Sequence, residues 1–135
     1  IKPTGVIAMR NQRYPITDLG IENLVLKLIE RGELDKAAGR RECEVTFHEN
    51  AKINGRKCTL LQVKNAEATE NLDFHMAQIF IDDELNVPIR YVAYDFPAKA
   101  GDPLPVIEEY TYLNLKLNVG LTDKDFDHTN EEYNF

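Results

Sequence analysis

Alternation of apolar and polar residues dominates the chain from about residue 43 onward. Along 43–48 every second residue is apolar, which is the period expected of a strand with one buried face. Asn54-Gly55 follows and is the strongest short signal for a two-residue hairpin turn, and 58–64 supplies the returning strand. The first two strands are therefore predicted to form an antiparallel hairpin.

Three further strands are predicted at 74–81, 89–96 and 107–119. The connections between consecutive strands are too short for a parallel crossover, so we expect an antiparallel meander of about five strands. The strands at 74–81 and 89–96 carry apolar residues on both faces. This pattern predicts that something covers each face of the sheet.

A period near 3.6 residues marks one amphipathic helix ahead of the sheet. Its apolar stripe consists of Ile21, Leu24, Val25, Leu28 and Ile29. Thr17 is a suitable N-cap and Gly39 a suitable end, so the pattern predicts a helix over 17–39. Because such a helix is marginal alone in water, we expect it to pack on one face of the sheet.

Together these elements predict a single α+β domain over residues 1–135. We expect an extended segment at 1–16, the helix at 17–39, the sheet at 42–119 and an acidic tail at 120–135. The chain begins with Ile1 and not with methionine, and we expect it to be the C-terminal part of a longer protein.

Charge and hydropathy narrow the classes of partner. The net charge is −7, and residues 121–135 hold five acidic side chains against one lysine. An acidic chain without a basic stripe is poorly matched to nucleic acid. No stretch approaches the roughly 18 consecutive apolar residues that predict a membrane-spanning helix.

The residues offer little chemistry for catalysis. The chain contains no serine, and its histidines at 48, 75 and 128 lack the spacing of a metal site. Asp123-x-Asp125-x-Asp127 starts like a calcium-binding EF-hand loop, but His128 stands where glycine is needed. Glu108 and Glu109 are adjacent on a predicted strand and point to opposite faces, so they cannot form an acid/base pair. We therefore expect no enzyme activity, no metal and no cofactor.

Two cysteines lie on the two strands of the first predicted hairpin. Cys43 and Cys58 lack the spacing of a redox or zinc motif. Two interpretations stay open: a structural disulfide formed in an oxidising compartment, and two buried thiols.

Four tyrosines gather on the last two predicted strands, Tyr91, Tyr94, Tyr110 and Tyr112. Such residues can line a groove for a sugar or lipid. The pattern favours cross-strand packing pairs over that role.

Four stretches resemble a bacterial family known as domain of unknown function 1571, whose members typically look exported. They are Arg13–Thr17, Ala51–Arg56, Phe80–Ala98 and Glu108–Asp127. The family implies no established activity. Its pattern is also similar to the lipoprotein-carrier superfamily, in which helices lid a curved antiparallel half-barrel. The resemblance thus implies a curved sheet and a location in the cell envelope or periplasm.

The strands that are apolar on both faces, taken with this resemblance, suggest a cavity. Our first hypothesis is a non-catalytic domain that holds a lipid or other apolar ligand between helix and sheet. The residues expected to line that ligand are Leu24, Leu28, Phe74, Met76, Phe80, Leu113 and Leu115. The alternative is a structural or protein-interaction module with no small-molecule ligand. The sequence leaves the oligomeric state open.

Overall fold

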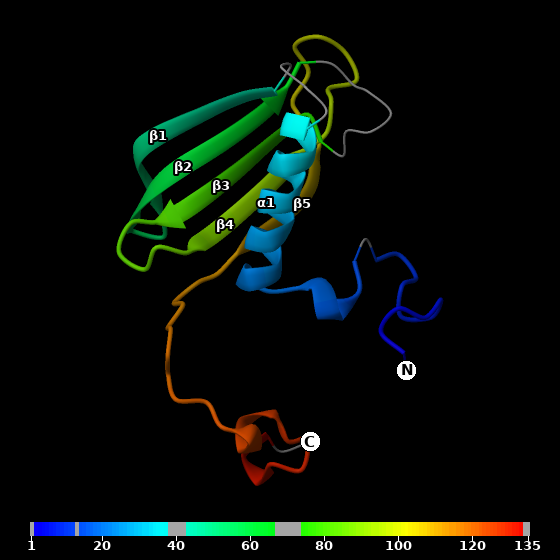
Figure 1. Ribbon diagram of the computed structural model, residues 1–135, viewed down its shortest axis with the longest axis vertical. Coiled ribbons are helices and arrows are strands. Elements are labelled where there is room, and N and C mark those ends of the chain that lie inside the picture. The colour runs from blue at the N-terminus through cyan, green and yellow to red at the C-terminus, as the bar shows by residue number, and fades with distance from the viewer. Residues whose placement is uncertain (1, 13, 38–42, 67–73, 134–135) are drawn as a thin grey trace.

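A five-stranded sheet with one helix in front of it forms the body of the computed structural model (Figure 1). The structure describes residues 2–12, 14–37, 43–66 and 74–133. The main elements are α1 (Ile21–Ala37), β1 (Cys43–Ile53), β2 (Arg56–Asn65), β3 (Met76–Asp82), β4 (Pro88–Tyr94) and β5 (Val106–Thr111). Three short 3₁₀ turns are η1 (Ile16–Asp18), η2 (Asp123–Phe126) and η3 (Glu131–Tyr133).

The predicted sheet is confirmed. The strands follow the order β1-β2-β3-β4-β5, every neighbouring pair is antiparallel, and the sheet is curved and not closed into a barrel. The β1–β2 hairpin has the predicted two-residue turn, because Ile53 pairs with Arg56 in register. Asn54 and Gly55 both have positive φ, 47° and 77°, as a type I′ turn requires.

The helix begins later than the sequence predicts. Thr17 lies inside η1 and does not cap α1, which starts at Ile21. The chain passes first through Gly20, whose φ of 110° cannot continue a right-handed helix. The predicted end of the helix at Gly39 lies outside the described residues.

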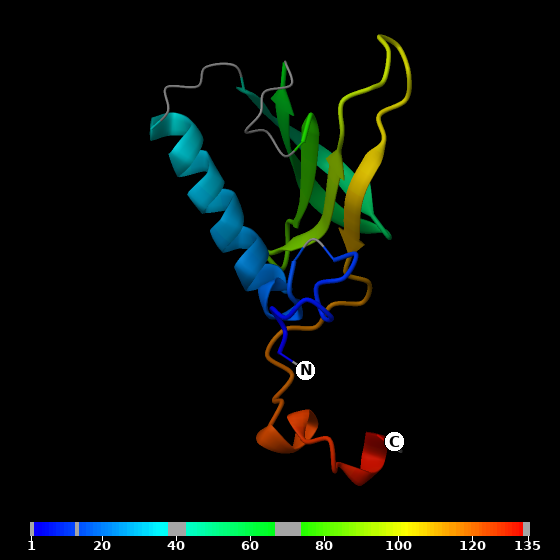
Figure 2. The ribbon, with the colours of Figure 1, turned by 90° about the vertical axis from the view of Figure 1, so that its right-hand side faces the viewer.

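The helix covers one face of the sheet at an angle. In Figure 2 the N-terminal end of α1 lies near the sheet and its C-terminal end stands further away. Leu24 and Leu28 pack against the sheet as predicted. Ile29, also part of the predicted stripe, is exposed. The core beneath the helix consists of the buried residues Ala77, Ile79, Tyr91 and Ala93.

No helix among the described residues covers the other face of the sheet, for which the sequence predicts a cover without indicating its nature. Val92 on that face is nevertheless only 1% exposed. Long side chains of the same face contact one another. Gln78 Nε2 donates to Gln62 Oε1 at 2.9 Å. Arg90 Cζ lies 6.0 Å from the centroid of the Phe80 ring. The apolar stems of such side chains can cover a sheet without a second layer.

The last strand ends at Thr111, eight residues before the predicted end at Val119. Asn114 and Asn118 have positive φ, 55° and 54°, and a residue in that conformation cannot belong to a regular strand. Leu113, predicted to face a ligand, is 61% exposed. The chain then runs away from the sheet and ends in η2 and η3 (Figure 1).

Of the two interpretations of the cysteines, the structure contradicts the disulfide between Cys43 and Cys58. Cys43 pairs with Asn65 in register and Cys58 with Ala51, so the two cysteines lie at opposite ends of the hairpin. The separation along β2 is about 23 Å at about 3.3 Å per residue, whereas a disulfide needs Cα atoms closer than about 7 Å. The two cysteines are not bonded to each other. Cys58 is fully buried, and this burial raises the pKa of its thiol.

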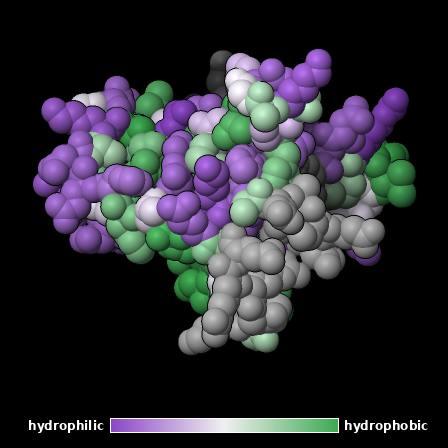
Figure 3. Space-filling view, turned by 90° about the horizontal axis from the view of Figure 1, so that it is seen from above, coloured by the Kyte–Doolittle hydropathy of each residue, from purple (hydrophilic) through white to green (hydrophobic). Residues whose placement is uncertain are grey.

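Exposed apolar side chains occur on several elements. Seen from above, hydrophilic groups cover most of the visible described surface, and hydrophobic groups show between them (Figure 3). The most exposed on the sheet is Phe47 of β1, at 67%. Among the described residues, no helix is long and apolar enough to cross a membrane.

Candidate functional site

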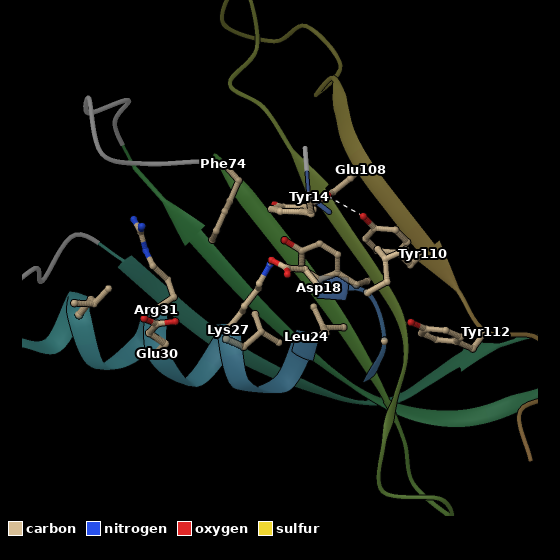
Figure 4. Close-up of a pocket in the computed structure, with 16 residues that line it drawn as sticks. Tyr14, Asp18, Leu24, Lys27, Glu30, Arg31, Phe74, Glu108, Tyr110 and Tyr112 are labelled. Atoms are coloured by element: carbon tan, nitrogen blue, oxygen red, sulfur yellow. Dashed lines mark hydrogen bonds and ion pairs between the residues drawn. The ribbon is translucent and has the colours of Figure 1, made fainter. Parts of the chain in front are cut away.

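The inclined helix leaves a pocket of about 440 Å³ between itself and the sheet. Its walls come from the segment around η1, from α1, and from β4 and β5 (Figure 4). Phe74, two residues before β3, contributes one aromatic ring. The lining residues are Tyr14, Asp18, Leu19, Gly20, Leu24, Lys27, Leu28, Glu30, Arg31, Leu34, Phe74, Tyr91, Ala93, Glu108, Tyr110 and Tyr112.

The inner surface of the pocket is apolar and is continuous with the core. Ala93 and Tyr91 of β4 are buried in the core cluster and also line the pocket. Leu24 and Leu28 face them from α1, and Phe74 closes the side next to β3. These residues share a face because strand positions alternate and helix positions recur every three or four residues. This part of the pocket can accommodate an apolar group.

A carboxylate lies among tyrosines at the β5 side of the pocket. Tyr14 Oη donates to Glu108 Oε1 at 3.3 Å, and Tyr110 Oη donates to Glu108 Oε2 at 3.2 Å (Figure 4). Tyr110 pairs in register with Tyr91, and their rings are stacked with centroids 6.2 Å apart. The cross-strand packing predicted for the tyrosines is thus confirmed for this pair, which lines the pocket as well.

Lys27 crosses the pocket from α1 toward η1. Its Nζ lies 3.0 Å from Asp18 Oδ2 and 4.3 Å from the centroid of the Tyr14 ring. The ion pair is largely accessible to solvent, so it contributes little to stability. It does link α1 to η1, and the same ammonium lies over the ring of Tyr14, which precedes η1.

Only some of the predicted ligand-lining residues meet in this pocket. Leu24, Leu28 and Phe74 line it. Met76 and Phe80 belong to the opposite face of β3, because they alternate with Ala77 and Ile79, whose side chains form the core beneath the helix. Leu113 and Leu115 follow β5 outside the sheet and do not line the pocket.

Several polar residues of the pocket were missed by sequence reasoning. Tyr14 belongs to the segment predicted as extended, Asp18 to the predicted first turn of the helix, and Lys27 to its predicted outer side. Glu108 carried a usable signal, because its spacing of two from Tyr110 puts both on one face of a strand. The sequence did not reveal that this face of β5 lies opposite α1.

Clustered acidic residues elsewhere have structural roles. Asp125 accepts the backbone N–H and the hydroxyl of Thr122, at 2.6 and 2.8 Å, and these hydrogen bonds lower the pKa of Asp125. Asp127 accepts the corresponding groups of Thr129, which lowers its pKa as well. Within the described ranges, no group of three or more histidine, cysteine or acidic residues is arranged to hold a metal ion.

Fold and pocket define an α+β domain in which one helix stands over an open antiparallel sheet and encloses a largely apolar cleft. The chain belongs to a family described as protein of unknown function (DUF1571), whose model matches residues 1–135. No curated protein and no solved structure matches the chain.

Proposed function

We propose that this protein is a non-catalytic binding domain that holds an apolar ligand, such as an acyl chain, between α1 and the sheet. The observation that carries the proposal is the pocket of about 440 Å³ with an apolar inner surface. Pockets for small molecules generally measure about 300–1,000 Å³ and combine apolar walls with a few polar groups. The Glu108 and Lys27 groups supply such polar positions.

The assignment as non-catalytic rests on how the charged side chains of the pocket are used. Lys27 pairs with Asp18, and Glu108 accepts hydrogen bonds from two tyrosines. We propose that these contacts are structural, because each of the two charged groups already has partners within the protein. We further propose a location in the cell envelope and a relation to the lipoprotein carriers, both from the sequence resemblance described above.

Ligand analysis of the purified protein tests the proposal directly. Native mass spectrometry and lipid extraction are expected to find a co-purifying lipid or, for a protein purified empty, saturable binding of a fluorescent acyl-chain probe. A protein that carries no ligand and does not bind the probe would count decisively against the proposal.

Two leucines on the same helix provide a matched pair of variants. Leu28→Gln places an amide in the pocket wall and is expected to weaken binding of the acyl-chain probe about tenfold, because burying a polar group beside the chain costs free energy. Leu26→Gln makes the same change at a position that is 57% exposed and outside the pocket lining. Its affinity for the probe should stay within about twofold of wild type. Equal affinities of the two variants would refute the placement of the ligand.

One observation favours a protein-interaction module as the second candidate. β1 is an edge strand, and its Val45 and Phe47 are both exposed on one face. An exposed edge of this kind can pair with an added strand. If the protein is such an interaction module, the acyl-chain probe should not bind. The protein should self-associate in sedimentation experiments, and Phe47→Lys should abolish this self-association.

A further inference from the structure

The segment ahead of α1, residues 2–19, exposes apolar side chains to solvent. The exposed fractions are 91% for Val6, 79% for Ile7, 73% for Ile16 and 52% for Leu19. The segment projects to one side of the domain in Figure 1, and Figure 3 shows hydrophobic groups on that same side. Scattered apolar residues on a surface are ordinary, whereas this concentration in one short segment indicates a surface that meets an apolar partner.

Hydrogen bonds within the segment hold its backbone in a defined path. The Gly5 N–H donates to the Lys2 carbonyl at 2.9 Å, and the Met9 N–H donates to the Gly5 carbonyl at 2.9 Å. Val6 and Ile7 lie within these turns, which satisfy backbone groups locally and leave the two side chains in solvent. The exposure of Val6 and Ile7 is therefore a property of the folded segment.

The segment also adjoins the pocket. The Leu19 N–H donates to the Ile16 carbonyl at 3.3 Å, which closes η1 just before α1 begins. Leu19 is half exposed and lines the pocket as well, as do Tyr14 and Asp18. A surface that binds this segment therefore lies next to the cavity proposed to hold an acyl chain.

The charge of the segment is opposite to that of the chain as a whole. Residues 1–17 contain three basic residues and no acidic residue, although the net charge of the chain is −7. Lys2 and Arg10 are both exposed. The first acidic residue that follows, Asp18, pairs with Lys27 at 3.0 Å. Exposed apolar side chains combined with basic ones are typical of surfaces that bind anionic membranes.

A bilayer fits these features better than a protein partner does. Side chains that protrude from short turns need no complementary groove, because the fluid boundary between headgroups and acyl chains accommodates them. Anionic headgroups supply the negative charge that attracts Lys2 and Arg10. Acidic side chains elsewhere on the protein repel such a membrane weakly, since physiological salt screens exposed charges separated by more than about 8 Å.

We infer that residues 2–19 dock the protein on anionic lipid membranes. The four exposed apolar side chains enter the boundary between headgroups and acyl chains, and Lys2 and Arg10 lie against anionic headgroups. Docking brings the pocket to a source of acyl chains, and this consequence, unlike the docking itself, rests on the proposed function.

Sedimentation with lipid vesicles tests the docking. Vesicles of phosphatidylcholine are compared with vesicles of equal parts phosphatidylcholine and phosphatidylglycerol, in about 0.15 M salt. Wild-type protein is expected to bind the anionic vesicles at least about tenfold more tightly than the neutral ones, because each basic residue near an anionic surface strengthens binding. Equal binding to both kinds of vesicle would contradict the inference.

Two pairs of substitutions test the apolar side chains. Val6→Gln combined with Ile7→Gln should weaken binding to the anionic vesicles at least about tenfold, because less apolar area enters the bilayer. Leu113→Gln combined with Val119→Gln makes the same kind of change at positions that are also exposed, after β5. This control should stay within about twofold of wild type. An equal loss in the two pairs would refute the placement of the docking surface.

Two further pairs test the basic side chains. Lys2→Gln combined with Arg10→Gln should remove the preference for anionic vesicles. Lys52→Gln combined with Lys116→Gln changes the net charge by the same amount at exposed positions outside the segment, and should keep the preference. A preference that falls equally in both pairs would show that net charge governs it, and the inference would fail.

The outcomes separate this inference from the proposed function. Vesicle binding without binding of the acyl-chain probe supports the docking and overturns the proposed ligand. Failure of the folded wild-type protein to bind any vesicle overturns the docking and leaves binding of the probe in the pocket standing. Binding of poly-glutamate, without binding of any vesicle, would assign the segment to an acidic protein partner and likewise overturn the docking.

A measurement on wild-type protein guards against variants that fail to fold. In anionic bicelles that contain a nitroxide-labelled lipid, the amide signals of Val6, Ile7 and Leu19 are expected to broaden. The amide signals of Leu113 and Val119 should stay sharp. Broadening confined to residues outside 2–19 would place the membrane on another surface and refute the inference.

Discussion

At the residue scale, Asp82 at the end of β3 is the clearest case of an ionised group built into the fold. Its side chain is only 1% exposed. Arg56 donates to both carboxylate oxygens, and the backbone N–H groups of Glu84 and Leu85 donate at 3.0 and 2.9 Å. The Arg56 hydrogen bond, followed by those N–H groups, holds the pKa of Asp82 well below its usual range despite the burial that opposes it. Asp82 thereby joins the β1–β2 hairpin to the β3–β4 turn.

The depressed pKa of Asp82 predicts acid sensitivity. Because the folded-state pKa lies below the unfolded value of about 3.9, the stabilisation is present above that value and is lost as the pH falls toward the folded-state pKa. Asp82→Asn is expected to lower the free energy of unfolding at pH 7 by about 1–3 kcal/mol and to flatten its decline between pH 5 and pH 2. Urea unfolding at a series of pH values measures both effects.

Asp102→Asn is the control for Asp82→Asn, because Asp102 lies exposed in the loop between β4 and β5. This control should change neither the stability at pH 7 nor its pH dependence. An Asp82→Asn profile that runs parallel to wild type would show that other carboxylates govern the acid sensitivity.

At the element scale, the hairpin turn requires a glycine with positive φ, whereas the glycine inside the helix has an ordinary helical conformation. Gly55 occupies the second position of the β1–β2 turn with φ of 77°, and an added Cβ would meet no atom within 4 Å. Gly32 lies inside α1 and also has open space around an added Cβ. Any effect of an alanine at either position is therefore conformational and not steric.

The two glycines predict opposite changes in stability. Gly55→Ala is expected to destabilise the protein by about 1 kcal/mol, because an L-residue resists positive φ. Gly32→Ala is expected to stabilise it by about 0.5–1 kcal/mol, because alanine favours the helix. Denaturant midpoints of the two variants measure the difference, and changes of the same sign would contradict the assigned turn or the helix.

The end of β5 shows how a pattern can mislead at this scale. Leucines alternate with polar residues through 113–119, as in a strand, yet β5 stops at Thr111. A strand needs a partner for its backbone groups as well as alternation. The Tyr112 N–H still donates to the Ile89 carbonyl at 2.8 Å, but β4 begins at Pro88, so the chain after Tyr112 runs past the end of its partner strand. The asparagines at 114 and 118 then adopt the left-handed conformation that this residue type tolerates.

At the scale of the whole molecule, the C-terminal segment is separate from the sheet and the pocket. Its hydrogen bonds are local: Asn130 Nδ2 donates to the Lys124 carbonyl at 3.1 Å, and Tyr133 Oη donates to the Asp125 carbonyl. Figures 1 and 2 both place this segment below the sheet. None of its residues lines the pocket.

Deleting residues 120–135 is therefore expected to leave the domain and its binding intact. The free energy of unfolding should change by less than about 0.5 kcal/mol, since no core residue is removed. Thermal unfolding and titration with the acyl-chain probe measure the two quantities. A large loss of either would mean that the segment packs on the body of the protein.

The sequence by itself determined the order and direction of the strands, the position of the first hairpin and the presence of one helix. These features depend on local patterns and on short connections: Asn54-Gly55 with the alternation around it specifies the hairpin, and a period near 3.6 residues specifies the helix. The same local pattern identified Leu24 and Leu28 as residues that face the sheet.

Only the tertiary structure decided how α1 lies over the sheet, and therefore which residues enclose the pocket. The inclination of a helix depends on side chains from several strands acting together, and no short stretch of sequence encodes it. That inclination brings Tyr14 to Glu108, 94 residues later in the chain, and places Lys27 over the Tyr14 ring. Met76 and Phe80 lie on the opposite face of the sheet. Periodicity tells which side of a strand a residue occupies, whereas the packing of distant elements determines what that side meets.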